Sequence, residues 1–218
     1  DYCWCERSYA PWSDFEKELR ENGLPLYALE SGDPLGDFDI VGFTLQYELS
    51  YSNVVNMLEL SGIPAFAADR GEDYPIIIGG GPCTYNPEPV ADFFDVFAIG
   101  EGEYMLTEFC ALYRDCRKKG MKKSEILRLA SHLDGFYVPS LYDVAYNSDG
   151  TINAVTPKYD DVPPVVTKRI VEDLDSAPFP TDFPVPYLET VHDRVTVEVF
   201  RGCIRGCRFC QAGMVYRP

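Results

Sequence analysis

The sequence lacks a long apolar run and has few basic side chains. Its longest apolar stretch, around Ile76–Ile78, is strand-sized and far short of the ~20 residues that span a bilayer, so no membrane partner is expected. The formal net charge is −16. Wide binding to a nucleic-acid backbone needs clustered Lys and Arg, so nucleic acid is not supported as a partner. The chain also starts at Asp1 without an initiator Met or a basic-then-apolar leader, which indicates no secretory signal.

The cysteines do not follow a disulfide pattern. A chain of 218 residues that is 46% hydrophobic can build its own core and has little need of covalent staples. Clustered cysteines in such a chain more often bind metal, so we expect a reducing, cytoplasmic location. Of the eight cysteines, Cys203, Cys207 and Cys210 lie in one loop, and Cys3 and Cys5 lie near the start. The other three are scattered and are predicted to be buried thiols: Cys83, Cys110 and Cys116.

Strand and helix patterns alternate through the first half of the chain, which predicts a doubly wound α/β fold with a parallel sheet. A capping box at Ser13 and Glu16 starts the first expected helix, and Gly23 stops it. The expected strands are 24–29, 39–45, 74–79 and 95–99, the second and third buried on both faces. The further expected helices are 50–60, one opened by Asn86 and Pro87, 103–119 and 124–133.

The pattern changes at residue 136. Residues 137–146 and 151–155, joined by a turn at 147–150, predict a β-hairpin, and the Pro-rich stretch 157–187 predicts an extended linker. Residues 194–200 are β-branched and predict a strand that leads directly into the cysteine loop. We therefore expect three parts: an α/β domain over 1–135, a hairpin and linker over 136–190, and the start of a further domain over 191–218.

Three loops follow the predicted strand ends in the α/β domain. They are Gln46–Ser52, Gly79–Pro82 and Gly100–Glu103. Ligands of open α/β sheets bind at the carboxyl ends of the strands, and glycines there let a backbone approach a ligand closely, although glycines also make plain tight turns. The candidate cofactor contacts are Ser50, Gly79, Gly80, Gly81, Gly100, Glu101 and Gly102.

The cysteine loop carries the most specific chemical signal. Three thiolates on one short loop can hold three corners of a cubane iron–sulfur cluster and leave the fourth iron open to a small molecule. A structural zinc site is the alternative, but it needs four ligands, and His192 is the nearby fourth candidate. Residues 201–218 hold four of the 19 basic residues and none of the 35 acidic ones, which suits an anionic cofactor.

The motif Cys203-x-x-x-Cys207-x-x-Cys210, with Phe209 before its last cysteine and a predicted strand before its first, resembles the radical S-adenosylmethionine (SAM) enzymes. The resemblance implies a [4Fe–4S] cluster on these three cysteines and SAM bound to the open iron. It also implies that the motif lies on the loop after the first strand of a (β/α) barrel. Phe209 would pack beside the cluster or the adenine. From their charge alone, we further expect Arg201, Arg205 and Arg208 to balance anionic charge. With this resemblance, we expect the sequence to be a fragment of a longer protein, cut at both ends, with a barrel of which only the start is included.

The α/β part resembles the cobalamin-binding-type, Rossmann-like domain that precedes the barrel in one branch of radical SAM proteins. Further segments resemble a bacterial family of uncharacterised proteins: Ala10–Trp12, Leu45–Tyr51, Gly80–Cys83 and Arg201–Gly213. Cobalamin is thus a candidate cofactor, but the Asp-x-His-x-x-Gly motif that ligates cobalt does not occur in the sequence. The domain either binds cobalamin without that histidine or keeps only the fold.

The expected function is therefore a radical SAM enzyme that reductively cleaves SAM and acts on an unknown substrate, with flavodoxin or ferredoxin as the reductant. This piece alone is expected to be inactive. The alternative is a non-catalytic α/β binding module whose cysteines form a zinc or redox clip.

Overall fold

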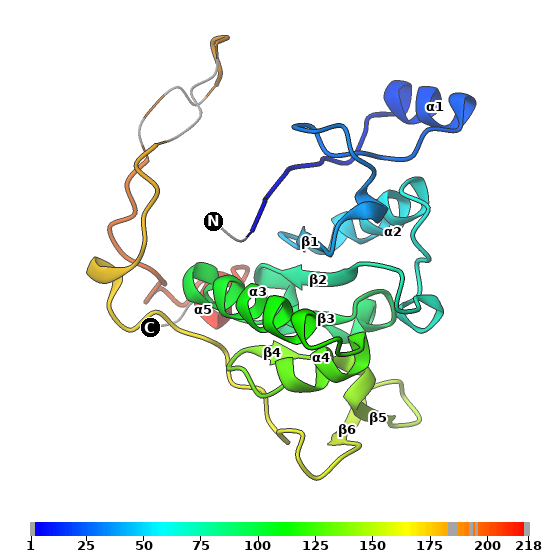
Figure 1. Cartoon of the computed structure of the whole chain (residues 1–218). Coiled ribbons are helices and arrows are strands. Elements are labelled where there is room, and N and C mark those ends of the chain that lie inside the picture. The colour runs from blue at the N-terminus through cyan, green and yellow to red at the C-terminus, as the bar shows by residue number, and fades with distance from the viewer. Residues whose placement is uncertain (1–2, 183–186, 192–193, 195, 216–218) are drawn as a thin grey trace. The chain divides into compact units, whose positions relative to one another are not determined.

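The structure is a computed structural model that describes residues 3–182, 187–191, 194 and 196–215. Its contacts divide the chain into two compact units, Asp1–Ile170 and Val171–Pro218. The first unit is the α/β body, and the second contains the cysteine loop (Figure 1). The three-part division drawn from the sequence stays a prediction.

The first unit contains helices and strands in alternation up to β3, followed by two helices, a short strand and a hairpin. The α-helices are α1 (Ser13–Asn22), α2 (Tyr51–Leu60), α3 (Gly102–Lys118) and α4 (Lys123–Ala130). The strands are β1 (Ile40–Thr44), β2 (Ile76–Gly80), β3 (Val96–Ala98), β4 (Phe136–Tyr137), β5 (Tyr142–Tyr146) and β6 (Ile152–Pro157). The second unit contains α5 (Ala212–Val215). No helix in the described parts of the chain is both long and apolar enough to cross a membrane.

The main sheet has the order β1-β2-β3-β4. β1, β2 and β3 are parallel, whereas β4 runs antiparallel to β3. An α/β fold is therefore confirmed, and β1, β2 and β3 form the parallel sheet that the alternating pattern predicts. The antiparallel β4 lies beyond that pattern, where the sequence predicted the start of the hairpin instead of a strand of the main sheet. Two helices separate β3 from β4, so the chain returns to the sheet from the opposite end. A doubly wound sheet needs a reversal of strand order, and the described strands have none. The Rossmann-like, cobalamin-binding-type description stays a prediction.

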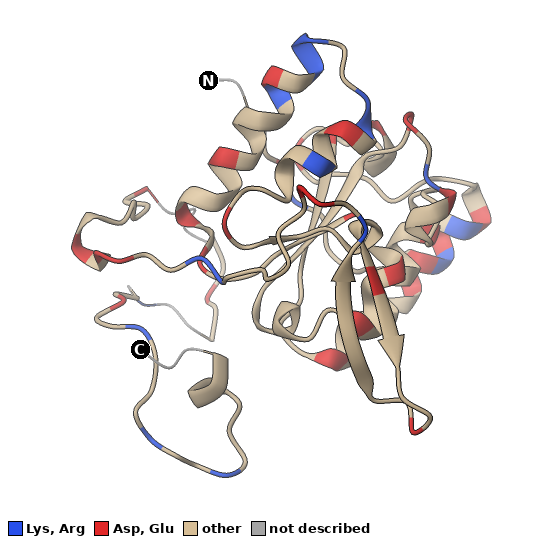
Figure 2. Ribbon diagram, turned by 90° about the horizontal axis from the view of Figure 1, so that it is seen from below, with Lys and Arg blue, Asp and Glu red and all other residues tan. Residues whose placement is uncertain are grey.

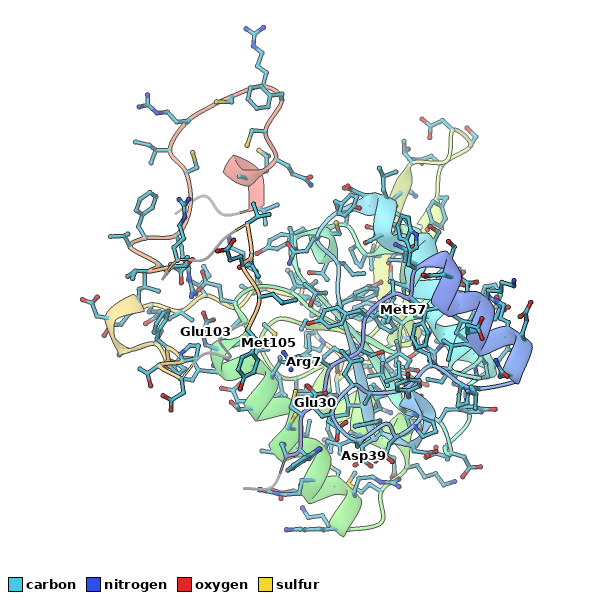
Figure 3. The ribbon with its side chains drawn as sticks, turned by 90° about the horizontal axis from the view of Figure 1, so that it is seen from above. Arg7, Glu30, Asp39, Met57, Glu103 and Met105 are labelled. Atoms are coloured by element: carbon cyan, nitrogen blue, oxygen red, sulfur yellow. The ribbon has the colours of Figure 1, made fainter. Side chains whose placement is uncertain are left out.

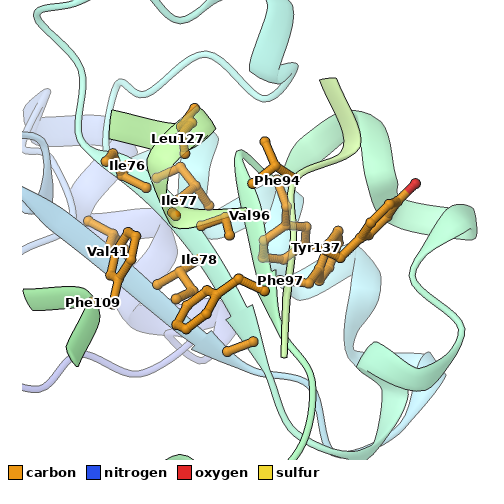
Figure 4. Packing of buried hydrophobic residues seen from close by; sticks show 14 of the residues in the cluster. Val41, Ile76, Ile77, Ile78, Phe94, Val96, Phe97, Phe109, Leu127 and Tyr137 are labelled. Carbon is orange, nitrogen blue, oxygen red and sulfur yellow. The ribbon is translucent and has the colours of Figure 1, made fainter. Parts of the chain in front are cut away.

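The hydrophobic core lies around β2 and β3 (Figure 4). Ile76, Ile77 and Ile78 are all buried. Because successive side chains of a strand point to opposite faces, both faces of β2 are covered, as predicted. β1 differs, because only Val41 of its residues is buried and it forms one edge of the described sheet. The expectation that this strand is buried on both faces is wrong.

Aromatic rings connect the elements around this core. The rings of Phe94 and Phe97 lie 4.8 Å apart. Phe109 of α3 stacks on Phe136 of β4 at 5.3 Å, which fixes the helix against the last strand of the sheet. Such ring pairs contribute about 0.5–1.5 kcal/mol each beyond their buried area.

A group of buried charges closes the amino end of the sheet. The Asp95 carboxylate lies 3.3 Å from the Arg70 guanidinium and 3.1 Å from the Lys123 ammonium, and it accepts a 2.8 Å hydrogen bond from the Ile77 amide. Arg70 also donates to the carbonyls of Pro64, Ala65 and Phe93. Burial lowers the pKa values of both Arg70 and Lys123, and Asp95 partly opposes this effect. Asp95 is therefore the shared anion that makes burial of two cations tolerable.

Helix α1 forms where it was predicted, but the capping box is wrong. Trp12 occupies the cap position and Ser13 is the first helical residue. Glu16 therefore does not reach back to the cap, and its side chain instead accepts hydrogen bonds from Arg20 and Asn56. The stop at Gly23 is as predicted, with a left-handed φ of 63°.

The strand expected over 24–29 is wrong. The Leu26 amide donates to the Leu60 carbonyl, whereas the Ala28 amide donates to Asp33. A β-ladder needs one continuous partner, and this stretch bonds to two different segments. The helix predicted after Asn86 and Pro87 is a 3₁₀ helix, Glu88–Phe93.

The hairpin forms, but with a shorter first arm. β5 and β6 pair across the turn at 147–150, where the Asn147 amide donates to the Thr151 carbonyl at 2.8 Å. The predicted arm began at residue 137. Pro139 opens a 3₁₀ turn, Pro139–Leu141, that separates β4 from β5 because proline cannot donate to a ladder.

The strand predicted over 194–200 does not form in the part of that stretch that the structure describes. Residues 196–200 are exposed and belong to no ladder. β-branched residues favour a strand only when a neighbouring strand completes its hydrogen bonds, and the described part of the second unit offers none. The barrel start therefore stays a prediction.

Candidate functional site

The carboxyl ends of β1, β2 and β3 lie next to one another. Thr44 is paired with Gly80, and Gly79 with Phe97. The loops after these strands consequently begin at one edge of the sheet, where open α/β sheets bind ligands. The seven candidate cofactor contacts lie in the loops at this edge. For each residue, its neighbours show whether the protein's own packing explains it or whether it is open to a ligand.

Two of the three glycines after β2 are required by the protein's own packing. A Cβ on Gly79 would lie 2.8 Å from the Phe97 ring. Gly81 has a φ of 98°, and a Cβ there would lie 2.9 Å from the Leu45 carbonyl oxygen. A side chain at either position would collide with the core, so neither glycine needs a ligand to explain it.

Gly100 is also explained by packing. Its φ is 122°, and a Cβ there would lie only 2.2 Å from the Arg169 carbonyl oxygen. Arg169 donates its amide to Ile99 at 2.9 Å and accepts from the Glu101 amide at 3.0 Å. Its guanidinium lies 2.8 Å from Glu108 of α3. Residue 169 thus occupies the Glu101 amide, a backbone donor beside Gly100 that an anionic ligand could otherwise have used.

Gly80 and Gly102 have open surroundings. A Cβ built on either would meet nothing within 4 Å. Gly80 ends β2 and Gly102 is the first residue of α3, a helix of 17 residues. The first amides of a helix have no partner within the helix. These two positions are therefore the part of the predicted glycine set that packing does not explain.

Ser50 is at the start of α2, but its hydroxyl donates to the Tyr47 carbonyl at 2.7 Å. The next residue, Tyr51, interacts with Cys83; the sequence placed both residues in family-like segments but gave neither a role at this site. Burial and the Cys83 thiol raise the pKa of Tyr51 to about 12. Thr84, also missed, is buried and donates to the Gly81 carbonyl at 2.7 Å, which holds the loop after β2. Only the Leu45–Tyr51 and Gly80–Cys83 segments pointed to this area.

The cysteine loop is open to solvent. Cys203 is half-buried, and Cys207 and Cys210 are exposed. The Cys210 amide donates to the Cys207 carbonyl at 3.1 Å, so the last two cysteines are joined by a tight turn. Phe209 is 92% exposed. The helix α5 follows directly after this turn.

The donor set of this loop fits an iron–sulfur cluster in its chemistry. It supplies three thiols and no competing carboxylate over residues 201–218. In the described part of the chain, however, no three Cys, His, Asp or Glu side chains stand close enough to hold a metal ion. His192, the fourth zinc candidate, lies outside the described residues. The loop therefore has the right kinds of ligand for a cluster, but the three cysteine side chains would have to move closer together to bind one.

The charged residues of the loop are basic (Figure 2). Arg201 is paired with Glu198 at 2.8 Å, and this pairing lowers the pKa of Glu198. Arg205 and Arg208 are exposed. Of the three arginines expected from their charge to balance an anionic cofactor, Arg201 is therefore already engaged with a carboxylate.

The scattered cysteines are partly as predicted. Cys83 and Cys116 are buried, whereas Cys110 is only half-buried. Burial and hydrogen bonding to Cys3 raise the pKa of Cys110 to about 11. The sequence gave no sign that a cysteine near the start would contact α3.

Comparison with known proteins gives a family. The family model described as "Radical SAM proteins, N-terminal" matches residues 1–139. An uncharacterized protein of Methanocaldococcus jannaschii is 27% identical over 204 residues, which cover 92% of this chain and 36% of that protein. The chain thus spans about a third of this relative's length. No solved structure matches the chain.

Proposed function

The chain belongs to the family of radical SAM proteins, N-terminal, and from this we propose that the whole protein is a radical SAM enzyme. The observation that carries the proposal is the three-cysteine motif in a chain of this family. The motif is Cys203, Cys207 and Cys210 at the spacing x3 and x2.

In this proposal the three cysteines bind a [4Fe–4S] cluster as thiolates. The exposure of Cys207 and Cys210 leaves them accessible for cluster assembly, and the turn between them brings their backbones near each other. Phe209, exposed without a cluster, would cover one side of it. Arg205 and Arg208 would lie close to the anionic cluster and to the carboxylate of SAM.

Held by Cys203, Cys207 and Cys210, a cluster with an open iron would supply the electron for reductive cleavage of SAM into methionine and a 5′-deoxyadenosyl radical. The electron comes from a one-electron reductant such as flavodoxin or ferredoxin. This chain's own part is to hold the cluster and place the cofactor. The radical chemistry belongs to the cofactor.

Cobalamin is left out of the proposal. Gly80 and Gly102 leave room at the carboxyl edge of the sheet, but neither offers a ligand to cobalt. His132, the histidine that the structure describes, lies 3.8 Å from Asp161 and follows α4. A ligand at the open glycines remains an expectation from the sequence.

The decisive experiment is anaerobic reconstitution of the full-length protein with iron and sulfide. We expect broad absorbance near ~400 nm from thiolate-ligated iron, and 5′-deoxyadenosine after addition of SAM and a reductant. One zinc per chain without labile sulfide would instead favour the binding module with a zinc clip. Failure to form either the cluster or 5′-deoxyadenosine would contradict the proposal.

Variants of the motif sharpen this test. Cys207→Ser and Cys210→Ser should each lose most of the cluster iron and all detectable 5′-deoxyadenosine, because a hydroxyl is a poor substitute for a thiolate. Cys5→Ser is the matched control, since Cys5 is also exposed but lies outside the motif. Equal iron content in all three variants would remove the motif from the site.

A further inference from the structure

A cavity of about 370 Å³ runs along the whole length of β1. One wall contains all five residues of β1, Ile40–Thr44. The opposite wall is the segment before α1, which contributes residues Glu6 and Ser8–Ala10. We call this cavity the β1 groove.

The backbone of β1 presents half of its groups to the groove. In the pairing with β2, the Asp39 carbonyl accepts from Ile76 and the Leu45 amide donates to Gly80. Backbone groups along a strand alternate between its two sides, so odd-numbered residues bond to β2 and even-numbered ones point away. The amides and carbonyls of Gly42 and Thr44 therefore face the groove, and both residues are exposed.

The segment before α1 is held in place by contacts with residues 29 and 30. The Arg7 carbonyl accepts from the Leu29 amide, and the Arg7 amide and guanidinium both bond to Glu30 at 2.8 and 2.7 Å (Figure 3). Residues 3–12 contain no turn or helix. The cavity lining includes Glu6 and Ser8, the residues on either side of Arg7.

The rest of the lining is mostly apolar. Leu35 and Phe38 contribute from the chain before β1, and Val54 and Met57 contribute from α2 (Figure 3 labels Met57). A row of backbone donors and acceptors on β1 thus faces a cavity whose remaining lining is mostly apolar. Water can hydrogen-bond to these backbone groups but gains nothing from contact with the apolar lining. An extended peptide can hydrogen-bond to the backbone groups and also bury apolar side chains against the lining.

We infer that the β1 groove receives one further β-strand, supplied by a part of the same polypeptide outside residues 1–218. The aligned region covers 36% of the M. jannaschii relative, so a protein of that length has ample chain for a strand. A strand from the same polypeptide also binds at a high effective concentration, which a separate peptide lacks. The inserted strand would pair with β1 and join the segment before α1 to the sheet.

Residue-resolved amide hydrogen exchange on the full-length protein tests this inference. Val41 and Phe43 serve as internal references, because their amides bond to β2 whether or not the groove is filled. We expect the amides of Gly42 and Thr44 to exchange at least ~100-fold more slowly than in an unstructured peptide, as the references do. Rapid exchange at Gly42 and Thr44 beside slow exchange at Val41 and Phe43 would show an open edge and overturn the inference.

A proline variant provides a second measurement. Gly42→Pro removes the amide that faces the groove, while Gly42→Ala keeps it, and a Cβ at this position makes an ordinary 3.6 Å contact with Ile78. Edge strands tolerate proline where the amide faces solvent. In the full-length protein we expect the proline variant to melt at least ~5 °C below the alanine variant, or to fail to fold.

Equal melting of the two variants would mean that the edge is free. Protection of Gly42 that disappears on dilution would assign the strand to a second copy of the chain, and that outcome also contradicts a strand from the same polypeptide.

Discussion

Asp95 is the residue on which the amino end of the sheet depends. It is buried, it faces the two buried cations Arg70 and Lys123, and it accepts the Ile77 amide of β2. We expect Asp95→Ala to destabilise the protein by about 3–5 kcal/mol, because two cations would remain buried without their anion.

Urea unfolding of the wild type and the variant measures this difference. Asp73→Ala, at an exposed aspartate four residues before Ile77, is the control and should change the unfolding free energy by less than ~0.5 kcal/mol. A similar small effect at Asp95 would contradict the assigned role.

Tyr113 should make the free energy of unfolding depend on pH in the alkaline range. Its hydroxyl donates to Asp39 at 2.9 Å, and burial together with this carboxylate raises the pKa of Tyr113 to about 12. The folded state therefore favours the neutral phenol. This contribution is complete below pH ~10, the pKa of an unfolded tyrosine, and is lost as the pH rises toward 12.

Tyr113→Phe should consequently be less stable than the wild type at pH 8, and the difference should shrink between pH 10 and 12. Urea unfolding at pH 8, 10 and 11 measures it. A difference that stays constant across this range would exclude a proton-linked role for the Tyr113 hydroxyl.

At the scale of elements, Gly100 shows what the sequence could and could not predict. The strand ends and their loops were predictable from apolar runs followed by glycine. The return of Arg169 to Gly100 was not, because nothing in a local pattern indicates a backbone contact 69 residues away. The same limit explains the missed antiparallel β4, which depends on how two helices redirect the chain.

Local patterns were reliable where one segment determines its own structure. α1, α2, α3 and α4 and the buried β2 follow from periodicity, length and a terminal glycine. The strand over 24–29 failed because strand formation depends on a partner that the segment does not contain. For the same reason, the spacing of the three cysteines was enough to predict them as ligands. It could not predict whether their side chains lie close enough together to form a closed site.

The two classes of glycine at the carboxyl edge should respond differently to substitution. Gly100→Ala places a Cβ against the Arg169 carbonyl at a positive φ that side-chain-bearing residues rarely adopt. We therefore expect the free energy of unfolding to fall by several kcal/mol, or the variant to fail to fold. Gly102→Ala adds a methyl group in open space at the start of α3 and should leave stability within ~0.5 kcal/mol.

Thermal unfolding of both variants checks this contrast. Equal loss at the two positions would mean that Gly102 is also constrained by packing. A stable Gly102→Ala protein that no longer binds a small-molecule ligand would instead mark the α3 start as a ligand contact.

At the scale of the whole molecule, the proposed ligands lie on a loop that is largely open to solvent in the part of the chain that the structure describes. Cys207, Cys210 and Phe209 are exposed in the part of the second unit that the structure describes. A radical enzyme has to exclude water and competing reactions from its reacting atoms. We therefore expect residues 1–218, reconstituted anaerobically with iron and sulfide, to produce no 5′-deoxyadenosine above a protein-free control, whereas the full-length protein produces it.

The comparison is informative only if the piece is folded and loaded. Far-ultraviolet circular dichroism and iron content should therefore be measured on the same sample, and Cys207→Ser in the same piece shows which iron depends on the motif. If the loaded piece cleaves SAM, the 218 residues must close the site by themselves, and the exposed loop would have to fold around the cluster. If it binds iron through the motif without turnover, the ligands lie in this chain and the pocket is completed by the rest of the protein.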